Sequence, residues 1–258
     1  MRRIAVINQK GGVGKTTTCA NLAHAFAMVG HRIGRNVLAV DLDPQGHLST
    51  TLGNDAAPAG VDALLADDLP LHDLVIQSRD GLALLGAGSR LADFEGLDAG
   101  LSGDTGLLGE RLNDADTYDI VMIDCPPSSG FLGRSGIVAA TEILIPVPGD
   151  YLAMVGLSSL LELLENIEAE IDRTLTKWIV VTRFDTRRNH AREVYDKLRE
   201  YFPDQLLHSV ITESVALTES PSFGQSIFEY KGTSRSASEY AALARELIET
   251  GQETRKTA

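Results

Sequence analysis

Apolar and β-branched residues are concentrated in short runs along this chain of 258 residues, and longer, more polar stretches separate the runs. A short apolar run without polar alternation is typical of a strand that is buried on both faces of a sheet. We therefore predict seven strands, at residues 4–7, 37–40, 82–85, 120–123, 143–147, 178–181 and 206–211.

Helical spacing of apolar residues occurs between these runs, most clearly at residues 16–29, 152–171 and 190–201. Strands that alternate with helices predict an α/β fold with a doubly wound, mostly parallel sheet flanked by helices. The length and the absence of a long linker favour a single domain over residues 1–250, followed by a flexible polar tail at 251–258.

A glycine-rich stretch, residues 10–17, follows the first strand and precedes the first helix. Its glycines let backbone N–H groups turn inward around an anion, and the helix start adds its positive end. Lys15 is placed to reach the β- and γ-phosphates of a nucleotide, Thr16 to ligate Mg²⁺ and Thr17 to contact the α-phosphate. The alternative is a turn that only joins strand to helix, and both context and spacing favour phosphate binding.

Carboxylates follow two of the predicted strands. Asp41 and Asp43 come after the strand at 37–40, and Asp124 follows the strand at 120–123. Because α/β sheets bind ligands at the carboxyl ends of their strands, we expect these side chains beside the phosphates. Asp124 would bind Mg²⁺ through water in a Walker B arrangement, and one of the other two could orient water. Turn or capping roles remain open for Asp41 and Asp43.

The generic phosphate-loop pattern has glycine six positions before its lysine, whereas this chain has Gln9 there, followed by a second lysine, Lys10. With that lysine the loop resembles the deviant Walker A box of the ParA/MinD superfamily. Similarity to chromosomal and small-plasmid ParA proteins of the Soj type continues at residues 144–157, 181–185, 219–224 and 234–244. The resemblance implies a P-loop NTPase of the deviant Walker A type. It also implies a homodimer with ATP sandwiched, in which Lys10 crosses to the nucleotide of the partner subunit.

The resemblance also implies roles for single residues. Asp43 matches the aspartate linked to hydrolysis, Asp41 would hold the magnesium shell, and Pro126 would stiffen the loop that senses the γ-phosphate. The expected catalytic residues are therefore Lys10, Lys15 and Asp43; the expected cofactor-binding residues are Lys10, Gly11, Gly12, Val13, Gly14, Lys15, Thr16, Thr17, Asp41 and Pro126; and the expected Mg²⁺ ligands are Thr16 and Asp124.

Charge is distributed unevenly along the chain. The net charge is 23 minus 36, or −13, and residues 55–119 hold fourteen Asp or Glu against three Arg, whereas residues 183–199 carry six cations against three carboxylates. Clustered cations suit nonspecific DNA contacts, and a solvated helix face is the alternative. Many ParA proteins have arginines where Glu213 and Ala216 stand here. The expected DNA contacts are Arg183, Arg187, Arg188, Arg192 and Arg235.

The resemblance implies an ATP-dependent, dimerising ATPase that positions or segregates a cargo by using the nucleoid. The cargo would be a plasmid, a chromosome or a protein assembly such as a microcompartment or chemoreceptor cluster. A ParB-like or cargo-adaptor protein would trigger Mg²⁺-dependent hydrolysis that is weak without it. The acidic stretch 55–119 would suit a Lys- and Arg-rich partner segment or serve solubility alone. The alternative function is an ATP-dependent regulatory or scaffold switch without a role in DNA partition.

The sequence has no run of about eighteen apolar residues and no secretion signal. Its polar tail lacks the amphipathic, basic face of a membrane switch of the MinD type. Two separated cysteines, Cys19 and Cys125, do not suit an iron-sulfur protein. We expect a cytoplasmic protein that associates with the nucleoid when ATP is bound and does not bind membranes.

Overall fold

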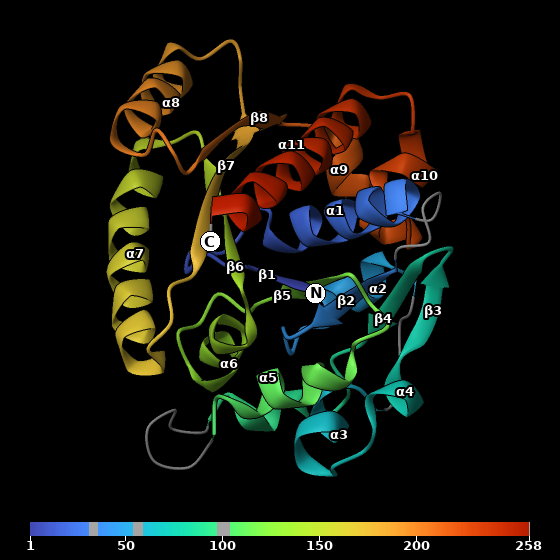
Figure 1. Ribbon diagram of the computed structural model, residues 1–258. Coiled ribbons are helices and arrows are strands. Elements are labelled where there is room, and N and C mark those ends of the chain that lie inside the picture. The colour runs from blue at the N-terminus through green and yellow to red at the C-terminus, as the bar shows by residue number, and fades with distance from the viewer. Residues whose placement is uncertain (31–35, 54–58, 97–103, 258) are drawn as a thin grey trace.

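The computed structural model describes residues 1–30, 36–53, 59–96 and 104–257. Within them the chain forms one eight-stranded sheet with helices on both faces (Figure 1). The strands are β1 (Arg2–Val6), β2 (Val37–Asp41), β3 (Ile76–Arg79), β4 (Leu82–Leu85), β5 (Ile120–Asp124), β6 (Glu142–Pro148), β7 (Thr176–Phe184) and β8 (Leu206–Thr212). Their spatial order is β3-β4-β2-β5-β1-β6-β7-β8.

All seven predicted strands are present and pair in parallel, which confirms the doubly wound α/β fold. The eighth strand, β3, is not among the predicted ones and pairs with β4 in the antiparallel direction at the edge of the sheet. The reason is its composition, because β3 is Ile-Gln-Ser-Arg and is exposed or half-buried throughout. A half-exposed edge strand of four residues carries no apolar run.

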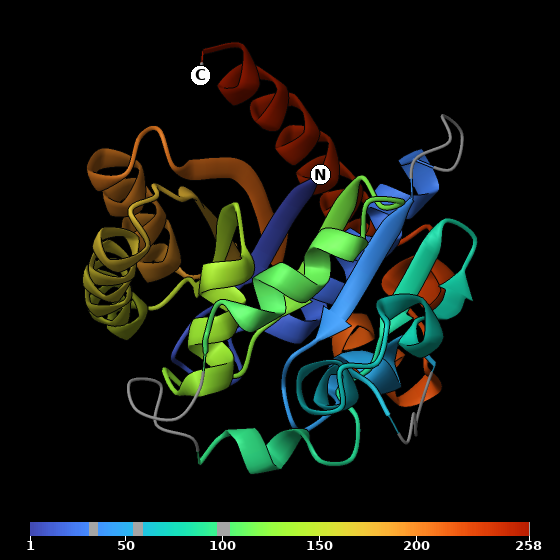
Figure 2. The same cartoon turned by 60° about the horizontal axis from the view of Figure 1, so that its bottom comes forward.

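Helices cover both faces of the sheet (Figures 1 and 2). One layer contains α1 (Lys15–Gly30), α2 (His47–Thr51), α9 (Val215–Glu219), α10 (Ile227–Lys231) and α11 (Arg235–Thr257). The other contains α3 (Val61–Ala66), α4 (Leu71–Leu74), α5 (Leu107–Arg111), α6 (Phe131–Ala139), α7 (Tyr151–Ile171) and α8 (Asn189–Tyr201). Three short 3₁₀ turns complete the described structure: η2 (Leu91–Phe94), η3 (Leu112–Asp114) and η4 (Ser220–Phe223).

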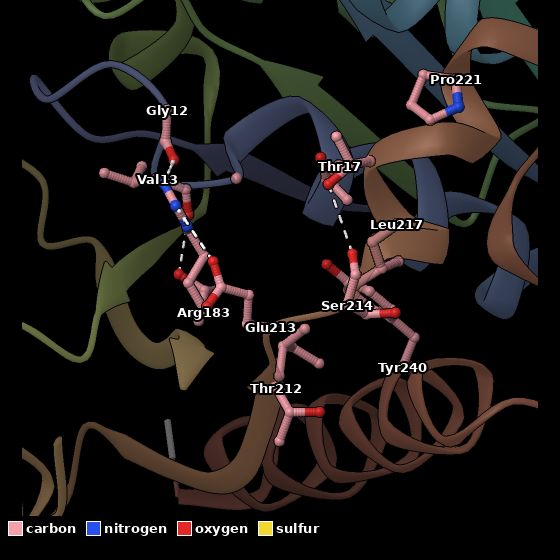
Figure 3. A pocket seen from close by; sticks show the side chains of 14 residues that line it. Gly12, Val13, Thr17, Arg183, Thr212, Glu213, Ser214, Leu217, Pro221 and Tyr240 are labelled. Atoms are coloured by element: carbon pink, nitrogen blue, oxygen red, sulfur yellow. Dashed lines mark hydrogen bonds and ion pairs between the residues drawn. The ribbon is translucent and has the colours of Figure 1, made fainter. Parts of the chain in front are cut away.

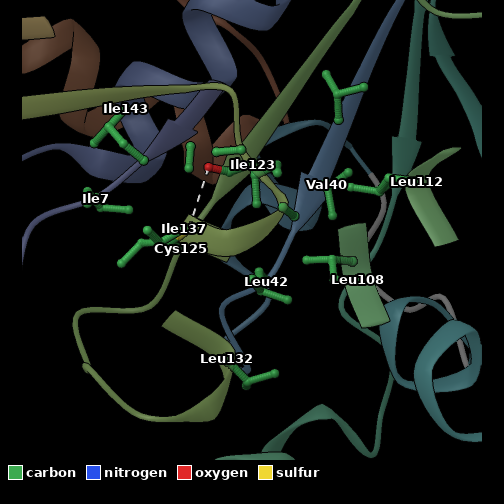
Figure 4. Close-up of a cluster of buried hydrophobic side chains, with 14 of the residues drawn as sticks. Ile7, Val40, Leu42, Leu108, Leu112, Ile123, Cys125, Leu132, Ile137 and Ile143 are labelled. Atoms are coloured by element: carbon green, nitrogen blue, oxygen red, sulfur yellow. Dashed lines mark hydrogen bonds between the residues drawn. The ribbon is translucent and has the colours of Figure 1, made fainter. Parts of the chain in front are cut away.

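The sheet separates two hydrophobic cores, because successive side chains of each strand point to opposite faces. In β2, Leu38 and Val40 belong to the core that Figure 4 shows, whereas Val37 and Ala39 belong to the core under α1 and α11. Burial on both sides explains why the strands read as unbroken apolar runs. The predicted apolar stripe of α7 is buried in the core of Figure 4 through Leu157, Leu160, Leu164 and Ile167.

The carboxyl-terminal helix α11 closes the layer over α1 and then extends past the sheet (Figure 2). The segment that we expect to be a flexible tail from residue 251 continues this helix to Thr257. The domain limit at residue 250 stays a prediction. Among the helices of the described residues, none is sufficiently long and apolar to cross a membrane.

A buried ion pair ties the amino-terminal edge of the sheet to α11. Arg2 donates from Nε and Nη2 to the two carboxylate oxygens of Glu142, at 2.6 and 2.7 Å, and from Nη1 to the Leu247 carbonyl at 2.8 Å. The indole N–H of Trp178 also donates to Glu142, at 2.9 Å. The Glu142 carboxylate thereby joins β1, β6 and β7, and the Arg2 guanidinium joins them to α11.

Glu142→Ala should lower the free energy of unfolding by about 3 to 5 kcal/mol, because it leaves a buried guanidinium and an indole N–H without their partner. Urea unfolding measures the change. Glu170→Ala is the matched control, since Glu170 pairs with Arg134 at an exposed position and its removal should cost less than about 1 kcal/mol. Equal losses of unfolding free energy in the two variants would show that the buried pair stabilises the fold no more than an exposed pair does.

Candidate nucleotide site

The phosphate-binding loop joins β1 to α1 and requires glycine at two positions. Gly12 has φ of 72° and Gly14 has φ of 91°, a left-handed conformation that side chains with a Cβ rarely adopt. Helix α1 begins at Lys15, and the first N–H groups of a helix have no partner within it. The loop and the helix start therefore present backbone donors to one anion-binding position.

Three side chains hold the loop in place. The Asn8 amide donates to the Pro146 carbonyl at 2.8 Å, and Asn8 Oδ1 accepts from the Lys10 N–H at 2.9 Å. Thr182 Oγ1 donates to the Val13 carbonyl at 2.8 Å. Arg183 adds a further bond, from Nη1 to the Gly12 carbonyl at 3.1 Å. Strands β6 and β7 thus fix the loop before any nucleotide arrives.

Lys15 is the cation at the centre of the site. Its side chain is buried, and its Nζ lies 3.4 Å from the Lys10 carbonyl. Burial lowers the pKa of Lys15, and the nearby carboxylates Asp124 and Asp43 partly oppose that shift. A buried ammonium group with only these charges nearby is suited to a phosphate anion, as the sequence predicts.

Two of the three acidic residues have turn or capping roles as well. Asp41 accepts hydrogen bonds from the Ser49 N–H and hydroxyl, both at 2.7 Å, and burial raises its pKa to about 6. Asp43 Oδ1 accepts from the Gln45 N–H at 3.0 Å in a tight turn. Because a carboxylate has a second oxygen, a turn role for Asp43 and a role toward water are compatible.

Asp124 is the one of these three acidic residues whose carboxylate oxygens have no hydrogen-bond partner among the described residues. It is fully buried opposite Asp41 in the β2–β5 register, and neither of its carboxylate oxygens has a hydrogen-bond partner of good geometry within the described residues. Burial, followed by the proximity of Asp41, raises its pKa well above the usual range, and the nearby Thr16 hydroxyl only partly opposes that shift. Orphaned carboxylate oxygens beside Thr16 fit Mg²⁺, which prefers hard oxygen ligands and would be held by Asp124 and Thr16.

A hollow of about 530 Å³ lies over this charged centre and is lined by Lys15, Thr16 and Asp43. His47 and Glu95 also line it, and neither titratable residue was predicted from the sequence. We call it the phosphate hollow. Pro127 contributes to its wall, whereas the neighbouring Pro126, which we expect to bind the cofactor, has a buried side chain.

A second hollow, of about 400 Å³, lies on the other side of the loop (Figure 3). The two hollows share Gly12, Gly14 and Thr17, so a nucleotide with its α-phosphate at Thr17 would place its nucleoside here. This nucleoside hollow was not predicted from the sequence. Its walls follow the carboxyl ends of β7 and β8, the edge at which α/β sheets bind ligands. Its apolar lining is Val13, Ile211, Leu217 and Pro221, and its polar lining includes Arg183, Glu213, Ser214 and Thr218.

Lys10 has an exposed position outside the phosphate hollow. Its ammonium lies 3.2 Å from Asp150 Oδ2, and both side chains are about half exposed, at 48% and 47%. It lines a smaller hollow together with Asp150 and Arg188. The structure therefore separates the two lysines of the loop, with Lys15 inside the site and Lys10 at the surface.

The predicted DNA-binding arginines are not equivalent in the structure. Arg187 and Arg235 line one hollow together with Lys231, whereas Arg183 faces the phosphate loop and Arg192 donates to the Thr186 carbonyl. Carboxylates lie among these cations. Asp185 pairs with Arg187 and Arg188, Glu213 pairs with Arg183, and Glu239 pairs with Arg235, at 2.7 to 3.4 Å.

The parallel sheet, the glycine loop, the buried Lys15 and the orphaned Asp124 together define a P-loop nucleotide-binding protein. The family model described as an AAA domain matches residues 1–177. The chain is 41% identical over 254 residues to the chromosome-partitioning ATPase Soj of Thermus thermophilus, which covers 98% of both chains. The protein belongs to the Soj/ParA family of ATPases within the ParA/MinD superfamily.

Solved structures agree with this assignment. Apo McdA of Cyanothece superposes with a TM-score of 0.83 at 22% identity, covering 96% of this chain and 99% of that chain, which supports the fold. A cobyrinic acid a,c-diamide synthase of Mycobacterium smegmatis with bound ATP analogue and magnesium has a TM-score of 0.73 at 30% identity, covering 92% and 98%. The phosphate loop, Lys15 and Asp124 of this protein fit the same two cofactors, ATP and Mg²⁺.

Lys15→Met should leave the protein folded and weaken ATP binding by roughly a hundredfold, which corresponds to about 3 kcal/mol of charge-assisted hydrogen bonding to the phosphates. The fold should survive because a buried, desolvated ammonium is replaced by an apolar chain of similar length. Equilibrium binding of a fluorescent ATP analogue measures the affinity. Lys177→Met is the control, since Lys177 pairs with Glu168 away from the loop. Unchanged affinity in Lys15→Met would contradict the assignment of the loop.

Proposed function

We propose that this protein is an ATP-gated dimerising switch that positions or segregates a cargo. The observation that carries the proposal is the position of Lys10, which is exposed outside its own phosphate hollow and is paired only loosely with Asp150. A cation at that place is available to the nucleotide of a second copy. ATP would then lie between two subunits, as the deviant Walker A resemblance implies.

Hydrolysis at this site would depend on six residues. Lys15 and the loop N–H groups hold the β- and γ-phosphates, Thr17 holds the α-phosphate, and Asp43 orients the attacking water. Asp41 would support the magnesium shell from the strand end. When bound at Thr16 and Asp124, Mg²⁺ supplies positive charge to the phosphates.

The relatives named chromosome-partitioning ATPase support a cargo role for this chain. In our proposal the ATP dimer holds the nucleoid through nonspecific DNA contacts, and a ParB-like or cargo-adaptor protein triggers hydrolysis and release. The chain would be nucleoid-associated with ATP and free without it. A basic segment of the partner would suit the acidic stretch 55–119, of which only the described residues have a known structure.

A regulatory or scaffold switch without DNA partition is the second candidate. The observation that favours it is the pairing of Arg183, Arg187, Arg188 and Arg235 with carboxylates. Internal partners compete with DNA phosphates for the same guanidinium groups. Nonspecific DNA affinity separates the two candidates, since the switch without partition requires none.

Lys10→Ala and Asp43→Ala should affect the dimer in opposite ways. Lys10→Ala should bind ATP as a monomer, because the cation that bridges to the second nucleotide is absent. Asp43→Ala should accumulate as an ATP dimer, because binding is intact and hydrolysis is slowed. Light scattering with ATP and with ADP measures the mass. A Lys10→Ala dimer, or an Asp43→Ala variant that hydrolyses ATP at the wild-type rate, would contradict the proposed roles.

Arg187→Glu combined with Arg188→Glu should weaken retention on DNA without changing ATP affinity, since both side chains are exposed and neither lines the phosphate hollow or the nucleoside hollow. The slope of log affinity against log salt should become shallower by about 0.9 for every DNA phosphate that the variant no longer neutralises. Filter binding at several salt concentrations measures this. Arg199→Glu with Arg245→Glu gives the same charge change at other exposed positions. Equal retention in both double variants would refute a specific basic face.

A further inference from the structure

The phosphate hollow has a carboxylate on its wall that comes from the acidic part of the chain. Glu95 follows the 3₁₀ turn η2 and lines the hollow with Asp43 and Lys15, which are far from it in sequence. This placement is held by packing. Leu91 at the start of the turn is fully buried, and Phe94 stacks on Phe131 with ring centroids 6.1 Å apart.

The same packing connects Glu95 to the Walker B strand. Phe131 is the first residue of α6, and the loop before that helix leads back to Asp124 at the end of β5. The Glu95 carbonyl lies 3.8 Å from the place a Cβ would occupy at Gly130. Glu95 therefore packs beside the segment that leads from Asp124 to α6.

Glu95 differs from the other carboxylates of the site in its bonding. Asp41 is engaged by Ser49, and Asp43 accepts from the Gln45 N–H. No described residue forms a hydrogen bond or ion pair with the Glu95 carboxylate, and Glu95 is exposed and lines the hollow. A free carboxylate facing a triphosphate repels it. Such a carboxylate opposes nucleotide binding. It can still favour hydrolysis if it contacts a water molecule that lies between the carboxylate and the γ-phosphate.

We propose that Glu95 is a second catalytic carboxylate, which accepts a hydrogen bond from the water that attacks the γ-phosphate and acts together with Asp43. The inference rests on the proposed hydrolysis at this site. The water oxygen forms the new bond to the γ-phosphorus while the bond to the β–γ bridging oxygen breaks, and that electron pair stays on ADP. The proton of the water leaves with phosphate or passes to solvent. Glu95 orients the water and is unchanged after the reaction.

The proposal predicts that Glu95→Gln keeps or raises the affinity for ATP and lowers the rate of hydrolysis. Glu95→Gln removes the negative charge and weakens the acceptor, so ATP should bind as tightly as to wild type or more tightly. Turnover at saturating ATP should fall by about tenfold or more, as expected when one hydrogen bond from the attacking water to a charged acceptor is weakened. A residue that only supports the fold would lower both together.

Asp93→Asn is the matched control, because Asp93 lies on the same turn, is exposed and is outside the lining of the hollow. It makes the same charge change two residues away. We would measure ATP affinity by equilibrium binding and single-turnover hydrolysis with the full chain for wild type, Glu95→Gln, Asp93→Asn and Glu95→Asp. Asp93→Asn should match wild type, and Glu95→Asp should recover part of the rate because a carboxylate is restored.

Turnover of Glu95→Gln within about twofold of wild type would overturn the proposal, as would a parallel decrease in ATP affinity. Equal slowing by Asp93→Asn would also overturn it, because the effect would then be general electrostatics. These outcomes are independent of dimerisation and DNA retention, which the Lys10, Asp43 and arginine variants test. Failure of the Glu95 inference therefore leaves the proposed switch intact, whereas absence of hydrolysis in wild type would remove the reaction on which the inference rests.

Discussion

A pair of buried carboxyl groups at the carboxyl edge of the sheet is the constraint on which the rest of this structure depends. The parallel register places Asp41 directly opposite Asp124, and Asp43 follows two residues later, with Lys15 as the nearby cation. Burial of carboxylates is costly unless they are paired. Ser49 satisfies Asp41, but no described group satisfies Asp124. The free protein therefore has a buried carboxyl group, Asp124, that a bound cation would satisfy, and a buried ammonium group, Lys15, that phosphates would satisfy.

The sequence was sufficient for features that depend on local burial. Seven strands and the centre of the phosphate site were predicted, because apolar runs report burial and glycine spacing reports loop conformation. Features that depend on packing between distant segments were not predicted. Glu95 reaches the phosphate hollow only because Phe94 stacks on Phe131, and the nucleoside hollow forms only where the ends of β7 and β8 meet the loop.

The basic face illustrates the same limit for electrostatics. Counting charges along residues 183–199 gives an excess of three cations. In space, Glu213 follows the end of β8 and pairs with Arg183, which the count treats as free. Glu239 of α11 likewise pairs with Arg235, a further cation of the predicted face. A local potential depends on every element that packs nearby, and exposed pairs of this kind are weakly held. The face is therefore less basic than the sequence indicates.

Trp178 gives this architecture an internal optical reporter. It is the only tryptophan of the sequence, it is 7% exposed, and its indole N–H is bound to Glu142 at the amino-terminal edge of the sheet. The candidate nucleotide site lies at the opposite edge, where the strands end. The intrinsic fluorescence should consequently follow the integrity of the sheet and its last helix, while ligand exchange at the far edge leaves its emission almost unchanged.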